Sequence, residues 1–166
     1  MRMALRLAAR AAKNGDVPCG AVLVDSKTGS VISRGFNQRE LKQRPCGHAE
    51  LLAIESGARK LKRWRLEDTV LYSTVEPCVL CYGALVAARV PRLVYGAPSP
   101  KFGACGGALP LHLVPLNHQP EITSGVLADE CAALLKDFFA KRRQKRKEQR
   151  ERKRQAEAAA QEEEEE

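Results

Sequence analysis

Two cysteines and a histidine constrain the fold of this chain more than any other feature. Cys78 and Cys81 lie in the stretch V-E-P-C-V-L-C (75–81), and His48 begins the stretch H-A-E (48–50). Cysteines three residues apart lie on one face of a helix. Two thiolates and one neutral imidazole balance the charge of Zn²⁺ and leave the fourth tetrahedral position open for water, as in catalytic zinc sites. We therefore expect a fold that brings these three residues together.

Glu50 is the candidate proton carrier of this site. Bound zinc lowers the pKa of a coordinated water to about 7. A carboxylate held beside the metal can take a proton from water and give it to a substrate nitrogen. We expect His48 and the two cysteines each to lie at the N-terminus of a helix, where the helix dipole favours the thiolate.

Two other readings of the same residues remain open at this point. A C-x-x-C pair is more often half of a structural zinc site or a redox pair, and a lone histidine is usually structural. A structural site would need a fourth ligand, and Cys46, two residues before His48, is a candidate. The joint occurrence of H-A-E and P-C-V-L-C favours the catalytic site.

The size and composition of the chain suit one globular domain. It has 166 residues, of which 44% are hydrophobic. The apolar runs are short and broken by charges, so we expect no membrane span. Arginines at positions 2, 6 and 10 argue against a secretory signal. We therefore expect a cytoplasmic protein whose six cysteines are metal ligands or free thiols.

The net charge of +8 is spread over the whole chain. Residues 141–166 hold ten basic and eight acidic residues, which leaves a charge of +6 on residues 1–140. A basic body favours a polyanionic partner, although charge alone does not identify one.

The predicted elements alternate between helices and strands. We expect helices over 2–14, 48–62, 77–88 and from 127, and strands over 21–24, 30–33, 69–73, 92–95 and 121–125. Pro77 is expected to open the third helix, because proline suits the first helical position. The long loop 97–118 is expected to be functional. This order predicts an α/β protein, a three-layer sandwich with a five-stranded mixed sheet.

The C-terminal residues form a separate part of the predicted organisation. We expect one zinc-binding domain over residues 1–140, followed by a basic helical extension from residue 141. The low-complexity end, residues 155–166, is expected to be disordered. The basic run either contacts a polyanion or is a solvated helix extension, and both readings stay open.

Several stretches resemble the cytidine/deoxycytidylate deaminase superfamily and, within it, the bacterial tRNA-specific adenosine deaminases. H-A-E with E-P-C-V-L-C carries the first resemblance. The second rests on V-P-C-G-A-V-L-V (17–24), T-V-E-P-C-V-L-C (74–81), V-Y-G-A (94–97) and G-V-L-A-D-E-C-A-A-L-L-K-D-F-F (125–139). The resemblance covers nearly all of residues 3–143 and does not extend to the C-terminal end.

This resemblance implies a cytidine-deaminase-like α/β/α fold and a homodimer with one zinc ion per subunit. The implied activity is deamination of the wobble adenosine in a tRNA anticodon to inosine. His48, Cys78 and Cys81 would bind zinc, and Glu50 would be the proton donor and acceptor. The residues expected to contact the anticodon stem-loop are Val17, Asn37, Ala49, Pro77, Lys101, Phe138, Arg142 and Arg143.

These contacts divide into three groups. The implied pocket for the base comprises Asn37, the segment around Val17, the backbone N–H of Ala49, and Pro77. Lys101, Arg142 and Arg143 are candidates for contacts to the RNA backbone. Phe138 or its neighbour Phe139 either stacks on a base or forms core and rim of the protein.

The chain departs from the family pattern at a few positions. Cys19 replaces the second valine of V-P-V-G, and Cys46-Gly47 stands where the family has a small or apolar residue. The stretch 98–102 lacks an acidic residue found in some members, and the first helix begins about one turn late. Contacts to the neighbouring nucleotide are therefore an open question.

Two competing functions stay open from the sequence. A deaminase of free guanine or cytosine would share the zinc ligands, the glutamate and the fold, but it has no need of a basic surface. A zinc-stabilised RNA-binding protein without catalysis has no need of Glu50 beside an open metal position.

Overall fold

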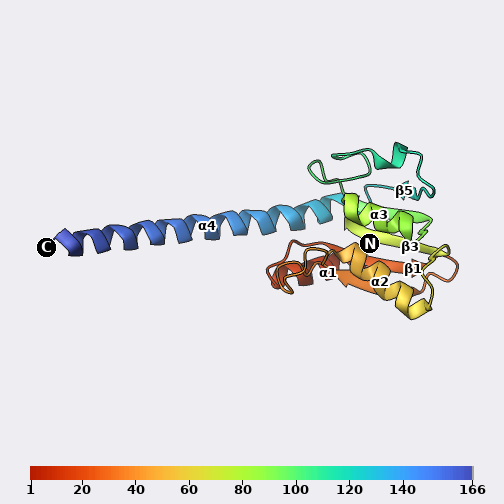
Figure 1. Cartoon of the computed structure of the whole chain (residues 1–166), viewed down its shortest axis with the longest axis horizontal. Helices are drawn as coiled ribbons and strands as arrows, with labels where there is room; N and C mark the ends of the chain where they lie inside the picture. The colour runs from red at the N-terminus through yellow and green to blue at the C-terminus, as the bar shows by residue number, and fades with distance from the viewer. Residues whose placement is uncertain (166) are drawn as a thin grey trace.

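A five-stranded mixed sheet organises the computed structural model, which describes residues 1–165 (Figure 1). The strands follow the order β2-β1-β3-β4-β5 across the sheet. They are β1 (Gly20–Asp25), β2 (Val31–Phe36), β3 (Thr69–Val75), β4 (Arg92–Ala97) and β5 (Glu121–Thr123). The helices are α1 (Arg2–Lys13), α2 (Ala49–Leu61), α3 (Val79–Ala87) and α4 (Ala128–Glu165), with a 3₁₀ turn η1 at Leu111–Leu113. The predicted fold class is confirmed.

The register of the central strands builds the core. β1 pairs antiparallel with β2 and β3, whereas β3, β4 and β5 are parallel. Leu23 lies opposite Leu71, which lies opposite Leu93, and all three are fully buried. These side chains therefore form a continuous apolar row across the middle of the sheet, on which the helices pack.

Helices cover both faces of the sheet. α2 contacts β1, β2 and β3 and also α3, while α1 contacts these three strands and α4. Ala53, Ile54 and Leu85 join the leucine row in the core cluster, which places α2 and α3 on the same side. The predicted three-layer arrangement follows from these contacts.

Gly35 allows α2 to approach the sheet closely. A Cβ atom on Gly35 would overlap the carbonyl oxygen of Ala49, at the start of α2. Only a residue without a side chain permits this approach. The position of the first turn of α2, which follows His48 and contains Glu50, therefore depends on Gly35 in β2.

The expected start of the third helix at Pro77 is wrong. α3 begins at Val79 with Cys78 as its N-cap residue, so Pro77 lies outside the helix. The Pro77 carbonyl accepts a hydrogen bond from the Ala104 N–H at 2.9 Å. The Pro77 carbonyl thus bonds to the loop, whereas the first helical hydrogen bond is accepted by the Cys78 carbonyl from Tyr82 N–H.

The last helix differs from the expectation for the end of the chain. α4 leaves the body as one long helix and continues to Glu165, whereas we expected disorder from residue 155 (Figure 1). Its residues are mainly strong helix formers such as Ala, Gln, Glu, Lys and Arg. Ion pairs one turn apart, Lys147–Glu151 and Lys153–Glu157, support the exposed part. Residue 166 lies outside the described residues.

The remaining expected elements lie within a few residues of those observed. The fifth strand is shorter than expected, ending at Thr123 rather than at residue 125. Within residues 1–165, none of the helices combines the length and apolar character needed to cross a membrane.

Candidate functional site

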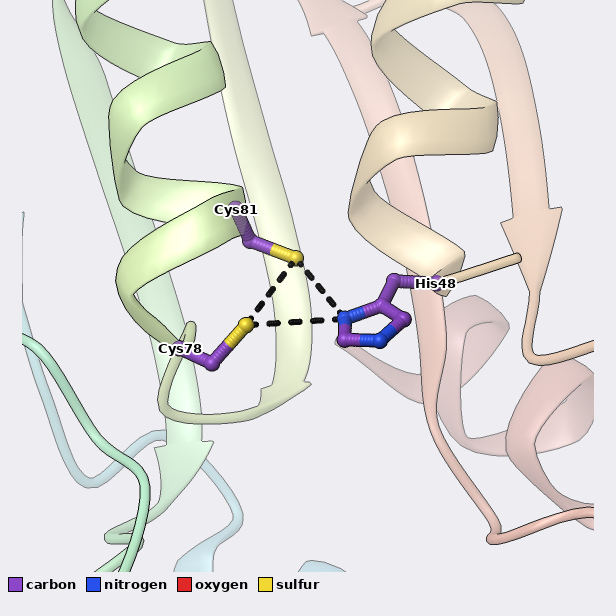
Figure 2. A group of neighbouring side chains, drawn as sticks. All are labelled: His48, Cys78 and Cys81. Carbon is purple, nitrogen blue, oxygen red and sulfur yellow. Dashed lines mark hydrogen bonds between the residues drawn. The ribbon is translucent and has the colours of Figure 1, made fainter. Parts of the chain in front are cut away.

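Three side chains from two helix starts converge on one point, as Figure 2 shows. The Nδ1 atom of His48 lies 3.5 Å from Cys78 Sγ and 3.3 Å from Cys81 Sγ. The two sulfur atoms are 3.7 Å apart. The expected clustering of His48, Cys78 and Cys81 is thus found in the structure.

The distances within this cluster suit a zinc ion. A tetrahedral zinc with its usual bond lengths places two thiolate sulfurs about 3.8 Å apart and a sulfur and a nitrogen about 3.6 Å apart. The observed separations of 3.7, 3.5 and 3.3 Å are close to these values. A donor set of two sulfurs and one imidazole nitrogen also binds zinc in preference to a hard cation such as Mg²⁺.

The ligands occupy equivalent positions at the two helices. His48 is the N-cap residue of α2, and Cys78 is the N-cap residue of α3, both with extended backbone. Their carbonyls accept the first helical hydrogen bonds, from Leu52 and Tyr82. Because the positive ends of both helix dipoles face the cluster, negative charge on the sulfurs is stabilised there.

The surroundings shift the pKa values of the three ligand side chains in different directions. A hydrogen bond from the Cys81 thiol, together with one to His48, lowers the pKa of Cys78 to about 4. The same bond to Cys78 raises the pKa of Cys81, and burial adds to this effect. The hydrogen bond with Cys78 also raises the pKa of His48. The surroundings of the cluster therefore favour the thiolate at Cys78 and the protonated forms of Cys81 and His48.

Glu50 lies at the second position of α2 and is 5% exposed. Burial raises the pKa of its carboxyl group. Glu50 Oε1 is 3.3 Å from the Ser73 hydroxyl, which also lies 2.8 Å from the carbonyl of Val75. The Glu50 carboxyl group lies close to both cysteines. It contributes to the raised pKa of Cys81, and Cys78 contributes to the raised pKa of Glu50. It therefore faces the metal cluster rather than solvent.

The structure answers the question about a fourth ligand. Among the described residues, the group that could hold a metal consists of His48, Cys78 and Cys81 alone. Cys46 is exposed and does not join it. Cys19 is half-buried, and burial, with the nearby Glu50 carboxyl, raises the pKa of its thiol. A metal in this cluster would keep a position free for water.

The expected pocket residues are all buried or half-buried. Asn37 follows β2 and is 5% exposed, and its backbone N–H donates to the Cys19 carbonyl at 3.0 Å. Its side-chain amide makes no hydrogen bond within the described part of the chain, so it is free to bind a ligand. Ala49 is fully buried, Val17 is half-buried, and Pro77 adjoins Cys78.

The expected RNA contacts lie further out. Lys101 is exposed in the turn Ser99–Gly103, and Gly103 pairs with Cys78 through an isolated β-bridge. On α4, Arg143 is exposed, and Arg142 forms a 3.3 Å ion pair with Glu40. This ion pair connects α4 with the loop before His48.

Phe138 occupies a half-buried position on α4. Its ring lies edge-on to that of Phe139, with centroids 5.4 Å apart, and Phe139 is 39% exposed. Phe138 is thus the more buried of the two rings, and Phe139 is the more exposed.

Two buried carboxylates near the site were not identified from the sequence. Asp16 is fully buried and accepts hydrogen bonds from the backbone N–H groups of Glu40 and Leu41 at 2.8 and 3.0 Å. Glu76 is 3% exposed and also accepts only backbone N–H groups. Both residues are visible in the sequence, in the stretches N-G-D and V-E-P-C. Their hydrogen-bond partners are backbone N–H groups, so no pattern of residue types marks these contacts.

Comparisons with known proteins agree with this geometry. The family model for the cytidine and deoxycytidylate deaminase zinc-binding region matches residues 1–97. A tRNA-specific adenosine deaminase of Bacillus subtilis is 45% identical over 146 residues, which is 86% of this chain and 88% of the relative. A tRNA-specific adenosine deaminase of Haemophilus influenzae is 44% identical over 86% of this chain and 83% of its own length.

Solved structures are similar over most of the chain. One, from a study of A-to-I editing by tRNA:A34 deaminases at the wobble position of transfer RNA, is 38% identical with a TM-score of 0.78. It covers 81% of this chain and 97% of its own. A guanine deaminase from Nitrosomonas europaea shares the fold with a TM-score of 0.69 and 24% identity, covering 84% of this chain and 83% of its own.

The protonation of the ligands predicts how zinc affinity depends on pH. At mildly acidic pH, Cys78 has already lost its proton, whereas the raised pKa values of His48 and Cys81 keep theirs bound. Zinc binding must release both protons, so affinity should rise by about a hundredfold per pH unit in that range. Competition titrations with a chromophoric chelator at several pH values would measure this.

Matched variants separate the ligands from the nearby thiol. Cys46→Ser should leave both the affinity and its pH dependence unchanged, whereas Cys81→Ser should lose zinc. A pH-independent affinity, or loss of zinc in Cys46→Ser, would contradict the proposed ligand set.

Proposed function

Because the chain belongs to the cytidine and deoxycytidylate deaminase family, and within it to the tRNA-specific adenosine deaminases, we propose that it deaminates the wobble adenosine of a tRNA anticodon to inosine. The observation that supports this most directly is the cluster of His48, Cys78 and Cys81 with buried Glu50 beside it. The proposed enzyme is a zinc-dependent hydrolase that acts in the cytoplasm, where its thiolate ligands stay reduced.

His48 Nδ1 and the sulfur atoms of Cys78 and Cys81 would hold the zinc ion. When bound, zinc supplies a water acidic enough to act as a nucleophile at neutral pH. Glu50 accepts a proton from the attacking water and delivers it to N1 of adenine. Oxygen bonds to C6 to give a tetrahedral carbon. Glu50 then carries the second proton of the water to the exocyclic NH₂ group, the bond from C6 to that nitrogen breaks, and ammonia leaves while the first proton stays on N1.

Ser73 supports Glu50 in the proton-carrying state. Its single hydroxyl hydrogen serves the nearer acceptor, the Val75 carbonyl at 2.8 Å. The Ser73 oxygen, 3.3 Å from Glu50 Oε1, can then accept a hydrogen bond from the protonated carboxyl group. Ser73 thus offers a partner to Glu50 when the carboxyl group holds a proton.

The base would enter between the segments that carry Val17, Asn37 and Ala49. The unpaired Asn37 amide can bind the nucleoside, and the Ala49 N–H at the start of α2 can donate to the base. A base reaches such a pocket only when it leaves its stack, which an anticodon loop permits at low cost.

The basic extension supplies a surface for the RNA backbone. Residues 141–154 hold ten basic and two acidic residues, and all of them are exposed. Over 14 residues a helix extends about 20 Å, which is long enough to follow several phosphates. We assign this face of α4, together with Lys101, to backbone contacts outside the reacting nucleotide.

An apolar surface beside the metal site suits a second copy of the chain. Val79 and Leu80 at the start of α3 are 47% and 46% exposed, and Phe102 on the adjoining loop is 71% exposed. Leu113 in the same loop is 72% exposed. Such a grouping of large apolar side chains is typical of a protein interface. A homodimer through this surface would bury it and stabilise the loop next to each site.

The role of Glu50 predicts a selective loss of chemistry. Glu50→Gln keeps the shape of the side chain but cannot carry the proton, so inosine formation in an anticodon stem-loop should fall by about a hundredfold or more. Zinc content should stay unchanged. Glu55→Gln, an exposed position of the same helix, should retain full activity.

The same assay distinguishes the alternative substrates. Wild-type protein should convert the anticodon adenosine and leave free guanine and cytosine unchanged. Turnover near the wild-type rate in Glu50→Gln would contradict the proton-carrying role, and turnover of a free base alone would favour the free-base deaminase.

The basic extension predicts a salt-dependent contribution to binding. Removing the chain after Phe139 should weaken binding of full-length tRNA and reduce the slope of log affinity against log salt, since fewer counterions are released. Removing only the residues after Arg154, which takes away six acidic and no basic residues, should not weaken binding. Equal affinities for both truncated chains across a salt series would assign the run to a solvated helix.

The apolar surface predicts a defined assembly. Sedimentation velocity should give a dimer for the wild-type chain and a monomer for Leu80→Asp. Leu41→Asp, also 46% exposed but located on the loop before His48, is the control and should remain dimeric. A monomeric wild-type chain at micromolar concentration would refute the dimer.

A further inference from the structure

Glu76 is a buried carboxylate that the proposed chemistry does not use. It is 3% exposed, and no cationic side chain pairs with it among the described residues. Its carboxylate instead accepts three hydrogen bonds from the long loop. Ser99 N–H donates to Oε2 at 2.7 Å, and the N–H groups of Cys105 and Gly107 donate to Oε1 at 2.8 and 2.9 Å.

The loop closes tightly around this carboxylate. A Cβ atom at Gly103 or Gly107 would overlap the Glu76 carboxyl group. Glu76 also joins the loop through its backbone, since its N–H donates to the Ala97 carbonyl at 2.9 Å. The segment 97–107 therefore wraps around one side chain rather than around an apolar core.

The same segment lies against the zinc ligands. Ala104 N–H donates to the Pro77 carbonyl, and Gly103 pairs with Cys78. The turn that precedes Gly103 exposes Lys101 and Phe102 to solvent. Glu76 thus connects the strand that leads into the ligand Cys78 with the turn that carries these two side chains.

We propose that Glu76 is a positioning residue that holds the loop 98–107 in place as one wall of the RNA-binding site. This inference rests on the proposed tRNA deaminase function. Holding the wall in its bound position before the RNA arrives reduces the ordering that binding requires. The loss of Glu76 should therefore affect substrate binding more than the chemical step.

The chemistry of the carboxylate makes Glu76→Gln a sharp test. Both carboxylate oxygens accept hydrogen bonds, whereas the glutamine side chain has one acceptor oxygen and one NH₂ donor. In either orientation of the amide, the NH₂ group faces at least one backbone N–H. The substitution keeps the size of the side chain but removes part of its hydrogen bonding.

Steady-state kinetics on an anticodon stem-loop provide the first measurement. Glu76→Gln should raise KM by about tenfold, with kcat changed by less than about twofold. Zinc content should remain that of the wild type. Glu121→Gln, the same substitution at an exposed carboxylate on β5, should leave both constants unchanged.

Amide hydrogen exchange provides a measurement that does not depend on activity. The amides of Ser99, Cys105 and Gly107 should exchange faster in Glu76→Gln, while those of the central strands keep their protection. A wild-type chain that fails to convert any anticodon adenosine would refute the proposed function, and the exchange data would still test the role of Glu76 in holding the loop.

The outcomes that overturn the proposal are distinct. An unchanged KM, or unchanged protection of the three amides, would refute it. A fall in kcat and zinc content at constant KM would assign Glu76 to support of the metal ligands instead. If Glu76→Gln does not fold, Gly107→Ala disturbs the same contact from the loop side, and an unchanged KM in that variant would overturn the proposal.

Discussion

The approach of two helix N-termini to each other is the constraint on which the site depends. His48 and Cys78 are the N-cap residues of α2 and α3, and each is held by the first hydrogen bond of its helix. Two sulfurs close together in a largely buried place would repel each other as thiolates. The helix dipoles and the imidazole offset that repulsion, and a divalent cation removes it. The position of α2 depends in turn on the missing side chain of Gly35.

Buried carboxylates hold the loops on both sides of this centre. Asp16 accepts N–H groups from the loop before His48, and Glu76 accepts them from the loop after β4. Neither loop has a large apolar core of its own. A charged acceptor with several short backbone hydrogen bonds can hold such a loop where hydrophobic packing cannot. The loops beside the metal cluster are therefore held by polar contacts, and the centre of the sheet by the buried leucine row.

The parts of the structure that the sequence predicts are those with a pattern of their own. The order of strands and helices follows from periodicity, and H-A-E with P-C-V-L-C indicates the metal cluster before any coordinates are known. The exclusion of Cys46 requires distances, because its spacing alone allows a ligand. The partners of Asp16 and Glu76 could not be predicted, since any residue type supplies a backbone N–H. α3 begins two residues later than the proline predicts, and the Pro77 carbonyl accepts a hydrogen bond from the long loop, a contact that no local sequence pattern marks.

The length of α4 affects which amino-acid substitutions such a protein can accept during evolution. From Arg143 to Glu157 every residue is exposed, so a substitution there alters charge without disturbing the packing of the body. Changes around Glu50 or Cys81, by contrast, affect a crowded interior. The charge of this exposed helix and the packing around Glu50 and Cys81 can therefore change separately, at positions that do not compete for the same space.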